Sequence, residues 1–261
     1  MKKNNRFKLF FMQNRKEKIF FIFSILFLIM FFVIGFNNII FKEGRSENRT
    51  QQAVLVELYI ADGCPACAVV EPILEQLVEE YSREKFILVE NPSWGLYSTP
   101  EISNRYRWYF PEYSERGVPN TLFNGLDDRI HGLTDYEMIK EKIEVLLNQQ
   151  PMVELETTRN TNSANSTFSG KVINIGDSTL TNLVINGMAF TDREKTGFRY
   201  SVVDIFEDEK VTISSLAPGQ EMDFTISMEG LDWEGDNLDG VIFVQSEYHE
   251  KKVIWQSIFV D

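Results

Sequence analysis

Cysteine and histidine are scarce in this chain, which has two of each among 261 residues. Two cysteines are too few for the disulfide framework that stabilises many small secreted proteins. A structural zinc site needs four ligands at paired spacing, whereas His131 and His249 lie far apart in the sequence. No serine–histidine–aspartate set and no glycine-rich phosphate-binding loop stands out. We therefore predict no resident metal and no cofactor, and chemistry that rests on the two cysteines.

Positive charge is also in short supply, with 26 lysines and arginines against 39 aspartates and glutamates. Residues 1–41 nevertheless carry seven basic and one acidic side chain. Because the whole chain has a net charge of −13, residues 42–261 carry −19. Phosphate backbones repel such an acidic region. Nucleic acid is therefore not expected as a partner.

Long apolar runs are absent except for one, residues 19–36, which contain no charged side chain and are followed by Ile39-Ile40-Phe41. This length suffices to cross a hydrocarbon core of about 30 Å, so residues 19–41 are predicted to be a transmembrane anchor in the lipid bilayer. The basic residues 1–18 are then cytoplasmic and the rest of the chain is extracytoplasmic. A cleaved signal peptide is the alternative, but no small-x-small cleavage site and no cysteine for lipidation follows the run. A single-pass protein of the cell membrane is expected.

The rest of the chain changes character twice. Residues 42–52 are polar and aperiodic, which is typical of a linker. The remaining residues exceed the usual size of one domain, and their pattern changes near Pro151. Two domains are predicted, at residues 53–150 and 151–261.

Residues 53–150 alternate between strand and helix patterns. The strands are expected at residues 54–60, 86–89, 118–123 and about 129–130, and the helices at residues 67–81, 102–110 and from Thr134 onward. The helix after residue 134 opens with a capping box, Thr134-Asp135-Tyr136-Glu137. This order predicts an α/β fold, an open sheet with helices on its faces.

Residues 151–261 have no helical pattern. Eight strands are expected, at residues 152–158, 167–175, 182–190, 198–206, 210–214, 221–228, 240–247 and 252–259, separated by turn-forming clusters. Short strands at this spacing predict an all-β sandwich.

The two cysteines stand as Cys64-Pro65-Ala66-Cys67, between the first predicted strand and the first predicted helix. Unpaired N–H groups at a helix N-terminus favour a thiolate, and a second thiol about one turn further on can resolve a mixed disulfide. A purely structural disulfide is disfavoured, because a loop this short yields little entropic stabilisation. A metal site formed by these cysteines and His131 is a further alternative.

Two motifs together resemble the thioredoxin superfamily, over about 100 of the 261 residues. The first is the strand, Cys-x-x-Cys and helix of residues 54–81; the second is Gly117-Val118-Pro119, followed by a strand and by Asn124-Gly125. Residues 151–261 resemble the immunoglobulin-like modules of surface proteins at the level of pattern alone. No disulfide can join their sheets, because they contain no cysteine.

The resemblance implies a role for each matching residue. Cys64 is the exposed nucleophile of a redox-active disulfide, and Cys67 is its buried resolving partner. Val118 presents its backbone to an extended substrate, beside the spacer residues Pro65 and Ala66. Pro119 follows a cis peptide bond and keeps metal ions off the thiols. Because Ala66 offers no donor or positive charge to a thiolate, the spacer argues against a strongly oxidising enzyme.

Glu57 interrupts an otherwise apolar strand, seven residues before Cys64. Burying a carboxylate is costly unless it is paired, neutralised or used. It lies about where thioredoxins have a buried acid, so one hypothesis makes it a proton acceptor for Cys67 with a raised pKa. The other places its side chain at a solvated rim.

These features predict a membrane-anchored, extracytoplasmic thiol–disulfide oxidoreductase, with exported protein thiols and disulfides as substrates and a membrane or extracytoplasmic redox partner. Two alternatives stay open: a surface scaffold with a non-catalytic thioredoxin-like fold, and an extracytoplasmic metal carrier. The aromatic segment 105–113 is either a peptide-docking surface or ordinary helix packing.

Overall fold

A computed structural model describes residues 50–162, 165–193 and 198–260. The predicted basic tail at residues 1–18, the anchor at residues 19–41 and most of the linker at residues 42–52 lie outside these ranges. Within the described ranges, no helix is long and apolar enough to cross a membrane.

The first half of the described chain forms a sheet with helices on its faces, as predicted, and the sheet is mixed. Its elements are β1 (Val54–Ala61), α2 (Cys67–Glu80), β2 (Phe86–Trp94), α3 (Pro100–Tyr109), a short 3₁₀ turn (Tyr113–Glu115), β3 (Asn120–Phe123), β4 (Asp128–His131) and α4 (Tyr136–Leu147). Strand β1 is buried along its whole length, pairs in parallel with β2 and pairs in the antiparallel sense with β3. Strand β4 extends the sheet beyond β3. The predicted order of strands and helices in this half is confirmed.

Polar side chains cap two of the helices. Thr99 caps α3 by accepting the N–H of Ile102, and Pro100 opens the first turn. Asp135 caps α4 by accepting the N–H of Met138, so the cap lies one residue later than the predicted capping box places it. An ionised aspartate also interacts more favourably with a helix N-terminus than a threonine does.

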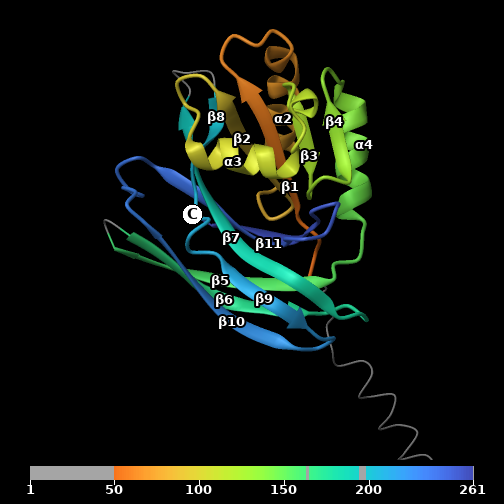
Figure 1. The fold of residues 1–261 in the computed structure, drawn as a ribbon, viewed down its shortest axis with the longest axis vertical. Helices are drawn as coiled ribbons and strands as arrows, with labels where there is room; N and C mark the ends of the chain where they lie inside the picture. The colour runs from red at the N-terminus through yellow and green to blue at the C-terminus, as the bar shows by residue number, and fades with distance from the viewer. Residues whose placement is uncertain (1–49, 163–164, 194–197, 261) are drawn as a thin grey trace, which may run out of the picture. The chain divides into compact units, whose positions relative to one another are not determined.

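The helices lie on both faces of the sheet. Helices α2 and α4 contact each other on one face, while α3 crosses the other face and contacts β2 (Figure 1). Side chains of a strand alternate between faces, so Glu57 and Tyr59 point towards α3 and Leu58 points towards α2. This alternation determines which side chains can reach the cysteines.

The described residues of the second half, 151–162, 165–193 and 198–260, form eight strands, as predicted. They are β5 (Val153–Asn162), β6 (Asn165–Asn174), β7 (Leu180–Arg193), β8 (Phe198–Ile205), β9 (Val211–Leu216), β10 (Glu221–Glu229), β11 (Leu238–Ser246) and β12 (Ile254–Val260). Strands β10, β6 and β5 form one sheet, and β12, β11, β7 and β9 belong to the other. An apolar core that includes Phe168, Phe224 and Ile242 fills the space between these sheets.

The two halves share one sheet and one core. Strand β8 lies parallel to β2, with Glu90 opposite Ser201, and so joins the sheet of the first half to β7, β11 and β12 (Figure 1). Phe190 and Phe243 from the second half pack in the same cluster as the side chains of β1 and β2. Contacts thus join Thr50–Asp261 into one compact unit, while the predicted boundary near Pro151 stays a prediction.

Candidate functional site

Cys64 and Cys67 are joined by a disulfide at the turn between β1 and α2, with their Cα atoms 5.3 Å apart. Gly63 has a φ of 67°, a left-handed conformation that favours glycine, and it turns the chain out of the strand. Cys67 is the first residue of α2, so Cys64 precedes the helix instead of opening it. The N–H of Cys67 donates to Cys64 Sγ at 3.1 Å. The sulfur therefore occupies the position of a capping group on an otherwise unsatisfied helical N–H.

The two sulfur-bearing residues differ in exposure. Cys67 is 1% exposed and packs in the apolar core, whereas Cys64 is partly exposed at the edge of that core. Pro65 is exposed and Ala66 is partly buried in the turn between them. An incoming sulfur can therefore reach Cys64 more readily than Cys67.

Val118 and Pro119 lie beside the disulfide, 54 residues further along the chain. The oxygen of Val118 is 3.9 Å from Cys64 Sγ, and the Val118–Pro119 peptide bond is cis, as the resemblance implies. Tyr106 of α3 holds this segment by donating its hydroxyl to Gly117 O at 2.8 Å. Pro119 is buried and Val118 is half-buried. The structure thus brings together Cys64, Cys67, Val118 and Pro119.

Glu57 is placed differently from both expectations. It is fully buried, so the solvated-rim interpretation is wrong. Its carboxylate accepts from Arg105 Nε at 2.6 Å and Nη2 at 2.8 Å, and from the Tyr109 hydroxyl at 2.6 Å. The Tyr59 hydroxyl adds a bond of 3.3 Å. Because these partners lie on the α3 side of the sheet, away from α2, the arrangement gives Glu57 a structural role and does not support proton transfer to Cys67.

Sequence reasoning missed the partners of Glu57. Arg105 is 5% exposed and also donates to Gln245 Oε1 at 3.0 Å, while Gln245 donates to the Tyr109 hydroxyl at 2.8 Å. Gln245 belongs to β11, so this buried network joins the two halves of the described chain. An acid in an apolar strand signalled that a partner was needed, but nothing in the sequence placed that partner in α3 and β11.

The aromatic segment that contains Arg105 is mainly packing. Tyr106, Tyr109 and Phe110 are each at most 3% exposed, and Tyr106 stacks on Tyr59 with ring centroids 4.1 Å apart. Tyr113, at 86% exposed, is the exception. The packing interpretation therefore holds for Tyr106, Tyr109 and Phe110.

A second buried carboxyl, Glu90 of β2, lies on the α2 side of the sheet and was also missed. Burial raises the pKa of Glu90 to about 8; the Tyr200 N–H, 3.1 Å away, opposes this rise and the charges of Glu71 and Glu75 add to it. Burial, followed by the charge of Glu75, raises the pKa of Glu71 to about 7. Glu90 Oε1 has no hydrogen-bond partner among the described residues. Glu90 is therefore protonated over much of the neutral range.

The folded state holds the proton of Glu90 more tightly than the unfolded chain, in which glutamate titrates near 4.5. Its contribution to stability is therefore complete below pH 4.5 and is lost as the pH rises towards 8. Glu90→Gln should remove most of this pH dependence of the free energy of unfolding. At pH 8 the variant should unfold with a free energy higher by on the order of a few kcal/mol, measured by urea unfolding. A smaller pH dependence, caused by Glu71, should remain. The exposed Glu84→Gln variant is the control, and a Glu90→Gln profile parallel to the wild type would contradict the assignment.

Metal ligands do not gather in the part of the chain that the structure describes, where no group of three or more histidine, cysteine, aspartate and glutamate side chains could hold an ion. His131 is exposed on β4, and its ring lies close to Gly117. The metal-carrier hypothesis gains no support from this arrangement.

Comparison with known proteins bears on the fold. No protein-family model and no curated protein matches the sequence. Among solved structures, the chain is similar to HBP35 of Porphyromonas gingivalis, with a TM-score of 0.63 and 13% identity over 80% of this chain and 74% of that one. It is also similar to protein AGR_C_4864 from Agrobacterium tumefaciens, with a TM-score of 0.54 and 14% identity over 80% of this chain and 95% of that one. At these identities the likeness shows a shared fold alone.

A thiol-disulfide isomerase from Corynebacterium glutamicum aligns with 41% of this chain and 88% of its own length, at 15% identity and a TM-score of 0.29. A TM-score this low carries no argument about activity. The fold is thus mixed α/β and mostly sheet, and it contains one disulfide-bonded Cys-x-x-Cys pair.

Proposed function

We propose that this chain is a thiol–disulfide oxidoreductase of thioredoxin-like fold that exchanges disulfides with exported proteins through Cys64 and Cys67. The observation that carries the proposal is the asymmetry of the pair. Cys64 is partly exposed, and its Sγ lies beside the Val118 carbonyl and accepts the first N–H of α2, whereas Cys67 is enclosed in the core. Exchange needs one sulfur that a client can reach and one that is held back to resolve the mixed disulfide.

The reaction balances without a cofactor. The Cys64 thiolate attacks a client disulfide, one client sulfur leaves as a thiolate, and a mixed disulfide forms. The Cys67 thiolate then attacks Cys64 Sγ, which releases the second client thiolate and forms the Cys64–Cys67 disulfide. The client is reduced and the pair is oxidised; the reverse sequence oxidises a client dithiol. The free N–H groups at the start of α2 stabilise the Cys64 thiolate in both directions.

The proposal places this chemistry outside the cytoplasm, with residues 19–41 as a membrane anchor and residues 1–18 in the cytoplasm. Support comes from the uncharged run at residues 19–36, from the basic residues before it and from the stability of disulfides in extracytoplasmic compartments. A redox partner in the membrane or in the extracytoplasmic compartment would return Cys64 and Cys67 to their starting redox state after each turnover.

The reduction potential of the pair tests the proposal. The purified chain is equilibrated in glutathione buffers of graded potential, and the fraction of free thiol is measured by alkylation and mass spectrometry. We expect reversible titration of a two-electron couple above about −300 mV, the range of exchangeable disulfides. A value near −270 mV would identify a reductase and one near −120 mV an oxidase. A disulfide that stays oxidised in every buffer would overturn the proposal.

A further inference from the structure

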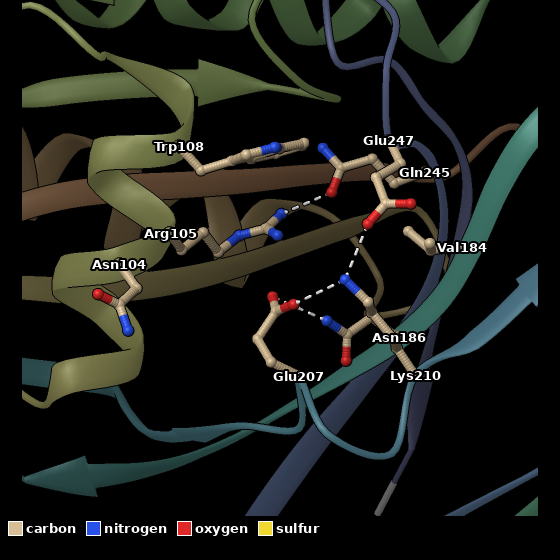
Figure 2. A pocket seen from close by; sticks show the side chains of 9 residues that line it. All are labelled: Asn104, Arg105, Trp108, Val184, Asn186, Glu207, Lys210, Gln245 and Glu247. Atoms are coloured by element: carbon tan, nitrogen blue, oxygen red, sulfur yellow. Dashed lines mark hydrogen bonds and ion pairs between the residues drawn. The ribbon is translucent and has the colours of Figure 1, made fainter.

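A cavity of about 310 Å³ lies between α3 and the strands β7 and β11, on the face of the sheet opposite to α2 (Figure 2). Its walls are formed by Asn104, Arg105, Trp108, Val184, Asn186, Glu207, Lys210, Gln245 and Glu247. Neither cysteine is among them. The volume falls at the lower end of the range of small-molecule sites.

Arg105 gives this cavity an unused pair of hydrogen-bond donors. The side chain is 5% exposed, and its Nε and Nη2 are bonded to Glu57, Tyr109 and Gln245. Nothing in the described part of the chain accepts from Nη1, and that atom is not sealed within the protein. Figure 2 shows the guanidinium reaching from α3 towards β7 and β11. A buried donor that is left open in this way needs an acceptor from water or from a ligand.

Further donors and acceptors line the opposite wall. Lys210 Nζ donates to Glu247 Oε1 at 2.8 Å and lies 3.5 Å from Glu207 Oε2, which leaves one of its three N–H groups free. Asn186 donates one amide N–H to Glu207 at 3.0 Å and keeps the other. Among the described residues, nothing donates to Glu247 Oε2. The cavity therefore offers both N–H donors and a carboxylate acceptor.

The walls carry two positive side chains, Arg105 and Lys210, and two negative ones, Glu207 and Glu247. Arg105 is also paired with Glu57 behind the wall, and Lys210 lies between Glu207 and Glu247, so no cation is left unpaired. An anion would meet these carboxylates without an unpaired cation, and a cation would meet Lys210 and Arg105. Hydroxyl groups suit such walls, because each one both donates and accepts a hydrogen bond without carrying charge.

Trp108 supplies an aromatic wall. Lys252 Nζ lies 4.0 Å from the centroid of its ring, but Lys252 is not part of the cavity wall. The Arg105 guanidinium lies 5.7 Å from the centroid of the same ring, below the indole in Figure 2, and part of Trp108 lines the cavity. A flat aromatic surface packs favourably against C–H groups, and the nearby Val184 adds apolar area.

From this combination we infer that the cavity binds a neutral saccharide, whose hydroxyl groups contact Arg105, Lys210, Asn186 and Glu247 while its C–H groups pack against the part of Trp108 that lines the cavity. The site is separate from the Cys64–Cys67 disulfide and does not depend on the proposed redox function. It would hold the protein at a glycan-containing surface.

Isothermal titration calorimetry of the full chain with maltose, cellobiose and N,N′-diacetylchitobiose tests the inference, with glutamate and glucuronate as charged comparators. We expect saturable binding of at least one neutral sugar and none of the comparators. Glu247→Gln and Trp108→Leu should each weaken it by about tenfold or more, since each removes a direct contact. Glu209→Gln, an exposed residue outside the walls, is the matched control.

Thermal unfolding checks that each variant is folded. If one of the two variants is unfolded, the affinity of the other is used for the test. Three results would overturn the inference. They are no binding of any neutral sugar, unchanged affinity in the Glu247 and Trp108 variants, and preferential binding of glutamate or glucuronate.

Discussion

Replacing Cys64 by serine should lower the rate of disulfide exchange by on the order of a thousandfold, because the variant loses the only accessible sulfur of the pair. A hydroxyl at this position is not ionised near neutral pH and cannot form a mixed disulfide. The helix N–H that donates to Cys64 Sγ would have no thiolate to stabilise. The measurement is the rate of insulin disulfide reduction by the full chain with dithiothreitol as the electron source.

Ala68→Ser is the matched control, since it places the same side chain at an exposed position of α2 and leaves both cysteines intact. Its exchange rate should equal that of the wild type. Activity of Cys64→Ser close to that of the control would show that Cys64 is not the nucleophile. The hypothesis of a scaffold with a non-catalytic thioredoxin-like fold would then be favoured.

Glu57→Ala and Arg105→Ala should each lower the free energy of unfolding by about 3–5 kcal/mol. Each change leaves one charge of a buried ion pair without its partner, and the residues involved are at most 5% exposed. The double variant should lose clearly less free energy of unfolding than the two single variants added together, because it removes both charges. Urea unfolding of the full chain measures all three values.

The exposed pair of Lys171 and Glu221, with 3.0 Å between nitrogen and oxygen, gives the matched comparison. Glu221→Ala should cost no more than about 1 kcal/mol, because water already solvates both charges. Equal losses of free energy of unfolding in Glu57→Ala and Glu221→Ala would contradict the claim that the buried pair of Glu57 and Arg105 stabilises the fold.

The same variants separate structure from catalysis at Glu57. If its role is structural, Glu57→Gln should change stability and leave the pH profile of disulfide exchange unmoved, provided that the protein is folded at the assay temperature. A shift in the pH dependence of the exchange rate would instead support the hypothesis that Glu57 is a proton acceptor. The contacts with Arg105 and Tyr109 favour the first result.

Local patterns in the sequence were sufficient to predict the strands and helices. The buried run at residues 54–60 became β1, and the apolar periodicity after Cys67 became α2. All eight strands of the second half occur where alternation and turn residues indicated them. The turn that bears the cysteines was predictable for the same reason, because strand, turn and helix signals follow one another within a few residues.

Contacts between distant segments were not predictable. The pairing of β8 with β2 rests on a single residue pair, Glu90 and Ser201, which no local pattern encodes. The partners of Glu57 lie 48 residues away at Arg105 and, through it, in β11 at Gln245. Two patterns that differ on either side of Pro151 predicted two domains, and yet Phe190 and Phe243 complete a core that begins with β1.

The most direct test of the central claim is the capture of clients by Cys67→Ser. This variant keeps the accessible sulfur of Cys64 and lacks the thiol that resolves mixed disulfides. When the variant is expressed as the full chain and free thiols are blocked at harvest, non-reducing electrophoresis should show higher-mass adducts that dithiothreitol removes. The account predicts that these adducts vanish in the Cys64→Ser, Cys67→Ser double variant. A folded Cys67→Ser protein without Cys64-dependent adducts would contradict it.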